Sequence, residues 1–435
     1  MTNAFSATGI NDISKRLKEP EWLTQLRYRA LEQHVQLPWP HKSDDIWRRT
    51  DTSLLDPMRG FTPVEAPLLQ GVALSEAQLQ AFTQPLGGEQ LVMRANGSWL
   101  SEPQVHGVAI EELPHAARTA PEPLQRLLEA DGLSEAEQKL ASLNAAFHHD
   151  DLYVQVPEGT ALERPVRLVH LFAASAKQAI FPMMLIRVGA GSTVTLIDEY
   201  ISVDGSSEEA PHLINARIEL VLEPDAVVQY VRLQRWDRRA REFLLQRATL
   251  ARGSTLTMAN ITLGAALSKA HVITKLNGER ASTKLYGFVF GHGRQHIDQH
   301  TLQDHQAPRT TSDLQLKAAL QDESRMIYTG LIRIAKQAQQ TEAFQANHNL
   351  MLSTQAKAET IPMLEILADD VQCKHGASIG PIDDEQAFYL MSRGIPARLA
   401  QRLIVMGFIE PIIQQVPFAP LQERLRAEIE GELRH

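Results

Sequence analysis

Cys373 and His375 are the two residues of this sequence whose types and spacing best suit metal chemistry. Side chains at i and i+2 of an extended chain lie on the same face, so this thiolate and imidazole could bind one metal ion or one edge of an iron–sulfur cluster. The alternative interpretation is a cysteine that is simply buried in packing. Iron–sulfur clusters commonly use four thiolates and the chain has one cysteine, so a cluster here would need ligands from another subunit.

A run of histidines forms a second group of possible ligands. The four are His292, His296, His300 and His305. In a helix the first three would share one face and could chelate a metal ion. The glycines at 291 and 293 favour an extended chain, in which alternation places His296, Asp298 and His300 on one face. A polar face or an interface is therefore the preferred interpretation, with metal binding as the alternative.

Two pairs of neighbouring acids, Asp369-Asp370 and Asp383-Asp384, raise the possibility of a polysaccharide-active enzyme. Adjacent residues of a strand point to opposite faces, so neither pair is expected to form an acid–base couple. The sequence has no H-E-x-x-H motif, and its G-x-G runs lack the other residues of a nucleotide-binding loop. We therefore predict no catalytic residues and no phosphate loop.

Composition restricts the class of protein. The chain has 435 residues, 43% of them hydrophobic and 22% charged, which is typical of a globular protein of two or three units. A net charge of −9 argues against a nucleic-acid partner. The single cysteine rules out an internal disulfide and fits a reducing compartment. No signal-peptide core and no apolar stretch long enough for a membrane span is present, so we expect a cytoplasmic protein without a membrane partner.

The elements that must position these residues change in character along the chain. Residues 1–150 predict a mainly helical region that includes a helix over 21–36 and helical spacing over 123–147. Within that region, residues 91–100 predict a small hairpin with Asn96-Gly97 at its turn.

Residues 151–380 are dominated by short β-rich runs, each followed by Gly, Pro, Asp or Ser. No helical pattern separates these runs, so a βαβ sheet is not expected. A sandwich, a barrel and a solenoid remain possible. Similar turns recur near Gly191, Asp225, Gly253 and Arg280, roughly 27 to 34 residues apart, and such a period favours a β-solenoid over a sandwich.

Residues 381–435 return to helical patterns. A first helix is predicted to begin at Asp383 and to end at Gly394. A second begins with Pro396 in its first turn and carries an apolar stripe of Leu399, Leu403 and Met406. An amphipathic helix over 420–435 follows. The apolar stripe suits either a cap on the solenoid or a docking element.

Residues 364–395, LEILADDVQCKHGASIGPIDDEQAFYLMSRGI, resemble the C-terminal signature of the SufB/SufD family of iron–sulfur cluster assembly proteins, and its SufD branch in particular. Weaker similarity lies at residues 328–332, 347–352 and 37–56, so the resemblance spans most of the chain. A small departure is Ile361-Pro362-Met363, where the family usually has Lys-Pro-Gln.

The resemblance implies a right-handed parallel β-helix core with helical N-terminal and C-terminal regions. It implies a non-ATPase scaffold subunit of a SufBCD-type complex, with no enzymatic activity of its own and a role where iron enters. The β-helix would pair with a SufB homologue, and the C-terminal helices would dock the SufC ATPase.

The resemblance also makes His375 the ligand at the interface with SufB, opposite a SufB cysteine, with Cys373 beside it. The isolated chain would hold no stable cofactor, because iron or the nascent cluster would lie at the subunit interface. A homodimer could form in the absence of SufB. The alternatives are a β-helix polysaccharide-active enzyme and a purely structural homodimer.

Overall fold

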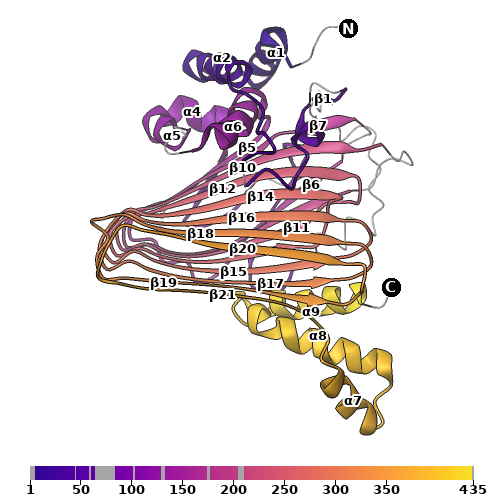
Figure 1. Cartoon of the computed structure of the whole chain (residues 1–435). Coiled ribbons are helices and arrows are strands. Elements are labelled where there is room, and N and C mark those ends of the chain that lie inside the picture. The colour runs from indigo at the N-terminus through magenta and orange to yellow at the C-terminus, as the bar shows by residue number, and fades with distance from the viewer. Residues whose placement is uncertain are drawn as a thin grey trace.

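Two facing β-sheets form the centre of the molecule (Figure 1). The computed structural model describes residues 5–44, 46–57, 60–63, 84–100, 103–128, 133–173, 177–203 and 210–433. From β8 onward, successive strands alternate between the two sheets, so each coil of the chain adds one strand to each sheet. Strands of neighbouring coils pair in parallel. The fold is therefore a parallel β-solenoid, as predicted, and not a sandwich.

The first sheet contains, in sheet order, β20 (Lys357–Ile366), β18 (Arg325–Ile334), β16 (His296–His305), β14 (Leu267–Leu276), β12 (Ala240–Leu250), β10 (His212–Leu222), β8 (Pro182–Val188), β5 (Asp150–Val156) and β4 (Ala109–Glu112). In addition, β7 (Gln178–Ile180) pairs with β10, and β1 (Thr62–Pro63) pairs with β7. The second sheet contains β21 (Val371–Pro381), β19 (Thr341–Met351), β17 (Thr311–Leu320), β15 (Ser282–Gly291), β13 (Thr255–Thr262), β11 (Val227–Arg235), β9 (Thr193–Ser202), β6 (Val166–Phe172), β2 (Gln90–Ala95) and β3 (Ser98–Trp99).

Alternation along each strand separates two environments. On β12 and β14, side chains such as Leu244 and Val272 point into the solenoid and join its apolar interior. The intervening side chains, such as Phe243 and Leu245, point outward and pack beneath the N-terminal helices. Because the parallel strands are in register, residues on the same face of successive coils stack above one another, about 4.8 Å apart.

The repeating turns explain the period of the sequence. Asp225 and Arg280 have φ values of 60° and 61°, in the left-handed region, and the equivalent glycines Gly191 and Gly253 have 62° and 68°. Each of these residues donates its N–H to the carbonyl group that precedes the equivalent turn residue of the next coil; for Asp225 the acceptor is Arg252, at 2.9 Å. The four predicted turn positions are thus the equivalent corner of successive coils.

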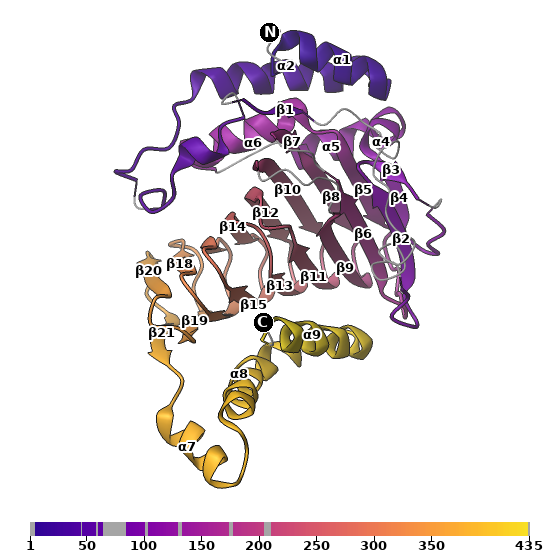
Figure 2. The same ribbon diagram turned by 90° about the vertical axis from the view of Figure 1, so that its right-hand side faces the viewer.

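The N-terminal helices cover the outer face of the first sheet (Figure 2). They are α1 (Ala7–Leu17), α2 (Glu21–Gln36), the 3-10 helix η1 (Thr52–Leu55), α4 (Leu113–Thr119), α5 (Pro121–Leu128) and α6 (Glu135–Phe147). The predicted helix over 21–36 and the hairpin with its turn at Asn96-Gly97 are both confirmed. Within the predicted helical stretch of 123–147, residues 129–132 lie outside the described residues.

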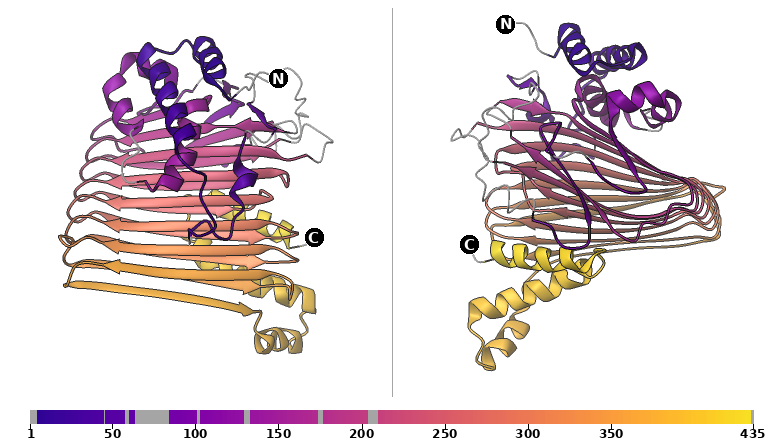
Figure 3. Two further views of the ribbon diagram at one scale, coloured as in Figure 1. Left: turned by 45° about the horizontal axis from the view of Figure 1, so that its top comes forward. Right: turned by 180° about the vertical axis from the view of Figure 1, so that it is seen from behind.

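The C-terminal helices are α7 (Asp384–Ser392), α8 (Ala397–Ile413) and α9 (Ala419–Glu432), and two of them lie against the second sheet (Figure 3). Val405 and Ile409 of α8 and Leu425 of α9 are buried against that sheet. Pro396 is the N-cap residue of α8, one position before the predicted first turn. In the described part of the chain, no helix is long and apolar enough to cross a membrane.

Candidate functional site

Cys373 and His375 lie on β21, the last strand of the second sheet. In register they are partners of Ala343 and Gln345 of β19, whose side chains face the interior of the solenoid. Cys373 and His375 therefore share the inner face, as alternation predicts. The thiol is half-buried beside Ile332, Ile334 and Ala343, whereas the imidazole is exposed.

The environment of Cys373 determines the protonation state of its thiol. Burial raises the pKa of Cys373 above its ordinary value, although a hydrogen bond with the backbone of Ala343 opposes this effect. The thiol is therefore protonated at neutral pH, and a metal ion that binds it must displace its proton. The exposed imidazole of His375 is the more accessible ligand of the two.

The end of the solenoid that carries this pair is uncovered among the described residues (Figure 2). β20 and β21 are the terminal strands of their sheets, so each has one edge without a strand partner in the described chain. Large apolar side chains are exposed along or beside these two strands. They are Leu364 (40% exposed), Ile366 (38%), Leu367 (60%) and Ile379 (46%). Unpaired edges with exposed apolar side chains are typical of a surface that another polypeptide covers.

The interior of the solenoid becomes polar as it approaches this end. The hydroxyl groups of Thr301 and Tyr328 lie 2.9 Å apart. Between β18 and β19, the Gln345 amide donates to the carbonyl of Gly330 at 3.1 Å. The predicted pair thus lies beyond a polar section of the interior, with His375 stacked in register over Gln345.

The acid pairs take structural roles at the turns near this end. Asp383 is the N-cap of α7, and its carboxylate accepts the backbone N–H groups of Glu385 and Gln386 at 2.9 and 3.4 Å. Asp370 lies in the turn between β20 and β21, where its carbonyl accepts from the backbone of Gln340 at 2.6 Å. This arrangement favours the prediction that neither pair forms an acid–base couple.

The four histidines of the 292–305 run lie in different environments. His292 is 3.2 Å from Glu432 of α9, and His305 points into the solenoid, with its Nδ1 2.8 Å from the Thr310 hydroxyl. His296 and His300 point outward from β16 on the same side as Asp298, which confirms the face predicted by alternation. His300 packs against His271 of β14, its register partner, with ring centroids 4.8 Å apart.

Sequence reasoning missed two residues beside His300. Glu137 of α6 and His271 of β14 join it in a buried group of three possible metal ligands. A local signal existed for Glu137, because Ser134 and Glu137 form a capping box at the start of α6. No local pattern placed that helix over β14 and β16.

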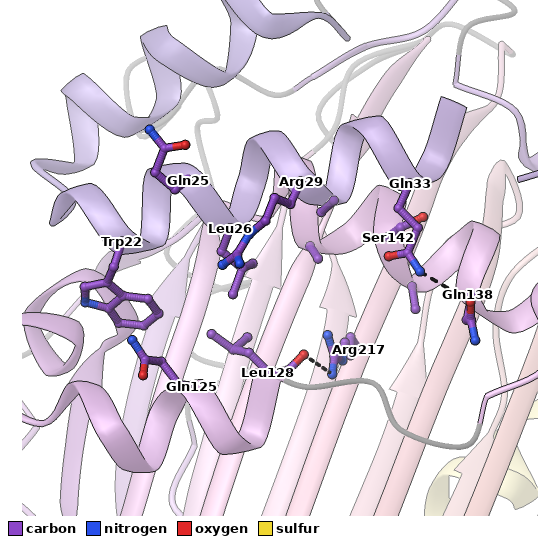
Figure 4. A pocket seen from close by; sticks show the side chains of 13 residues that line it. Trp22, Gln25, Leu26, Arg29, Gln33, Gln125, Leu128, Gln138, Ser142 and Arg217 are labelled. Carbon is purple, nitrogen blue, oxygen red and sulfur yellow. Dashed lines mark hydrogen bonds between the residues drawn. The ribbon is translucent and has the colours of Figure 1, made fainter. Parts of the chain in front are cut away.

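A cavity of about 720 Å³ is lined by residues of α2, α5 and α6 (Figure 4). Its wall includes Trp22 and Arg29 of α2, and Arg217, which donates to the carbonyl of Leu128 at 3.2 Å. Across it, Gln33 donates to the side chain of Gln138 at 3.3 Å. None of the described lining residues is an acid, a histidine or a cysteine, so this cavity lacks the ligands and bases for metal or acid–base chemistry.

The geometry defines a class of protein. It is a parallel β-solenoid with the thiol of Cys373 and the exposed imidazole of His375 on a terminal strand. Residues 171–408 match the family model described as SUF system FeS cluster assembly, SufBD core domain. The chain therefore belongs to the SufBD family of iron–sulfur cluster assembly proteins.

Curated relatives agree over nearly the whole length. The chain is 27% identical to the iron–sulfur cluster assembly protein SufD of Bacillus subtilis, over 98% of this chain and 97% of that protein. It is 27% identical to a SufBD family protein of Synechocystis over 94% of this chain and 90% of the relative. For a Staphylococcus epidermidis SufBD family protein the identity is 24%, over 98% and 93%. The chain is a homologue of SufD, consistent with the resemblance of residues 364–395.

Proposed function

We propose that this protein is a non-ATPase scaffold subunit of a SufBCD-type complex, in which it shares an iron or nascent cluster site with a SufB homologue and has no enzymatic activity of its own. The observation that carries the proposal is the position of Cys373 and His375 on the inner face of β21, at the uncovered end of the solenoid.

The free edges of β20 and β21 support pairing with a homologous solenoid. A partner strand can add to each edge through backbone hydrogen bonds, and the exposed side chains of Leu364 and Ile379 would then be covered. The same edges would accept a second copy of this chain, so a homodimer in the absence of SufB is part of the proposal.

The C-terminal helices support docking of a SufC-type ATPase. The described residues of α7 are all outside the core, and Phe388 and Tyr389 are 71% and 58% exposed. On α8, Leu399 and Leu403 of the predicted apolar stripe are 41% and 46% exposed. An exposed apolar surface of this kind is typical of a protein–protein interface.

In the proposed shared site, this chain would supply only some of the ligands, and its partner would supply the others. One thiol and one imidazole cannot complete the coordination of an iron–sulfur cluster, so release or completion depends on ligands from the partner. His375 would contribute its imidazole opposite a SufB cysteine, where iron enters. The isolated chain would then bind no cofactor stably.

The decisive experiment replaces His375 with alanine in the complex reconstituted with its SufB and SufC partners. Cluster formation, followed by visible absorbance and circular dichroism, should fall strongly while the complex stays assembled. Lys374→Ala is the matched control, because Lys374 is an exposed neighbour on the opposite face of β21. Unchanged cluster formation in His375→Ala would remove this residue from the mechanism.

Copurification tests the scaffold assignment separately. The tagged chain should retain both a SufB homologue and a SufC-type ATPase when the three are expressed together. A chain that forms only a homodimer under these conditions would contradict the proposal and favour the purely structural alternative.

A further inference from the structure

A second group of ligands lies far from β21, under the N-terminal helices. Glu137 of α6, His271 of β14 and His300 of β16 are buried, and one ligand atom from each lies within 4.8 Å of the others. The two histidines are adjacent because β14 and β16 pair in register, with His271 opposite His300. The carboxylate comes from the helix packed over this sheet (Figure 2).

Three imidazole nitrogens of this group are buried and lack a hydrogen-bond partner in the part of the chain that the structure describes. They are both ring nitrogens of His300 and Nε2 of His271. Buried polar atoms are nearly always satisfied, so each exception needs an explanation such as an ion or a water molecule. Here the exceptions are three nitrogens in one cluster, and imidazole nitrogen is a preferred ligand of divalent transition metals.

The distance between Glu137 and His271 is short enough for both side chains to bind the same metal ion. Oε1 of Glu137 lies 3.0 Å from Nδ1 of His271. Two ligands at about 2.1 Å from one ion are about 3.0 to 3.4 Å apart at angles of about 90° to 109°, so the observed separation lies at the short end of this range. In the metal-free protein the same contact is a hydrogen bond. The second oxygen of Glu137 accepts from the backbone N–H and the hydroxyl of Ser134 at 2.8 and 2.9 Å, which fixes the carboxylate.

The charges around the cluster also suit a cation. Glu137 is its one carboxylate, and Lys269, on the same strand as His271, is paired with Asp298 at 2.8 Å. A divalent ion would therefore meet one carboxylate beside an internally compensated pair.

We propose that Glu137, His271 and His300 form a binding site for a divalent first-row transition metal, which ties α6 to the solenoid. Two imidazoles and one carboxylate leave further coordination positions for water, as in other three-ligand sites. Hard cations such as Mg²⁺ and Ca²⁺ prefer oxygen ligands and are not expected here. This site is independent of the proposed cluster site on β21, because its ligands come from α6 and from the outer face of the other sheet.

Zn²⁺ and Co²⁺ are the probes for this site. The full-length protein, dialysed against a chelator, should bind one equivalent of Zn²⁺ here by elemental analysis, and its Tm should rise by a few degrees. Co²⁺ should give visible d–d bands that Zn²⁺ removes. His300→Gln and Glu137→Gln should each weaken Zn²⁺ binding at least about tenfold and abolish the rise in Tm. Circular dichroism of the two variants confirms that they fold.

His296→Gln and His375→Ala are the controls, because His296 lies on the same strand outside the cluster and His375 belongs to the other site. Both should keep the Zn²⁺-dependent rise in Tm. Binding lost in His375→Ala but retained in His300→Gln would assign the ion to β21 and overturn the proposal. Wild-type protein that neither binds Zn²⁺ nor changes in Tm would mean that the cluster holds water only.

Discussion

Lys269 and Asp298 are register partners on β14 and β16, and Nζ of Lys269 lies 2.8 Å from the carboxylate of Asp298. Both side chains are almost completely buried. Lys269 also donates to the carbonyl of Ile46 at 2.7 Å, and the hydroxyl of Thr50 donates to Asp298. This ion pair therefore fastens the segment before η1 to the outside of the solenoid.

Removing one partner of this pair should be costly. Lys269→Met leaves the Asp298 carboxylate buried without its cation, and we expect a loss of about 3–5 kcal/mol in the free energy of unfolding, measured by urea denaturation. The matched control is Arg252→Met, because Arg252 and Asp225 form an equally short pair at 2.8 Å that is 62% and 54% exposed. That change should cost less than about 1 kcal/mol. Similar losses in both variants would contradict the argument.

Glu199 should make the free energy of unfolding decrease at acidic pH. Its buried carboxylate accepts from Arg167 at 2.8 Å, from Arg235 at 2.9 Å and from Arg424 of α9. Burial raises the pKa of Glu199, but these guanidinium groups lower it from 4.5 to about 2. Because the folded pKa lies below the unfolded one, the stabilisation is present above pH 4.5 and is lost as the pH falls towards 2.

The difference between the unfolded and folded pKa values of Glu199 corresponds to about 3 kcal/mol in the free energy of unfolding. Urea denaturation of the wild type at pH 7, 4 and 3 should show part of this loss, and Glu199→Gln should be less stable at pH 7 and lose that share of the pH dependence. A Glu199→Gln variant that keeps the wild-type pH profile would rule out this carboxylate as the source.

Gly278 should not tolerate a side chain. A Cβ atom there would lie 1.9 Å from the backbone nitrogen of Arg252 in the preceding coil, and the backbone cannot easily give way. Gly278→Ala should therefore destabilise the protein by about 1–3 kcal/mol in thermal or urea unfolding. Gly407→Ala is the control, because a Cβ atom there would have no described atom within 4 Å beyond its neighbours and the backbone of α8, and it should stabilise by about 0.5–1 kcal/mol. A neutral Gly278→Ala would mean that the coils can separate locally.

The exposed stripe of α8 should matter for partner binding and not for folding. Leu399→Lys combined with Leu403→Lys should leave the Tm nearly unchanged, because both side chains are partly exposed. The same variant should lose copurification with the SufC-type ATPase. Gln401→Lys is an exposed control on another side of the helix. Retention of the ATPase by the double variant would place its docking surface elsewhere.

Local patterns in the sequence were enough to predict the repeating part of the fold. Asp225 and Gly253 occupy equivalent left-handed corners of successive coils, so their spacing reports the length of a coil directly. The alternation that put Cys373 and His375 on one face, and His296 with His300, follows from strand geometry alone. Their inward or outward direction required the register with neighbouring coils.

Contacts between distant segments could not be predicted in this way. His271 meets Glu137 across 134 residues, and Arg424 meets Glu199 across 225 residues. Neither contact produces a periodic pattern in the sequence, because each depends on how a helix packs over the assembled sheet. The resemblance of residues 364–395 pointed to the family but carried no information about these buried ionic contacts.

The open end has a consequence for the order in which parts of the molecule become rigid. Every inner coil is held by a neighbour on each side, whereas the coil of β20 and β21 is held on one side within the described chain. In a quasi-one-dimensional stack the terminal repeat opens most readily. Cys373 and His375 would thus acquire a fixed geometry when a second subunit seals that terminus, so assembly and preorganisation of the ligands become a single event.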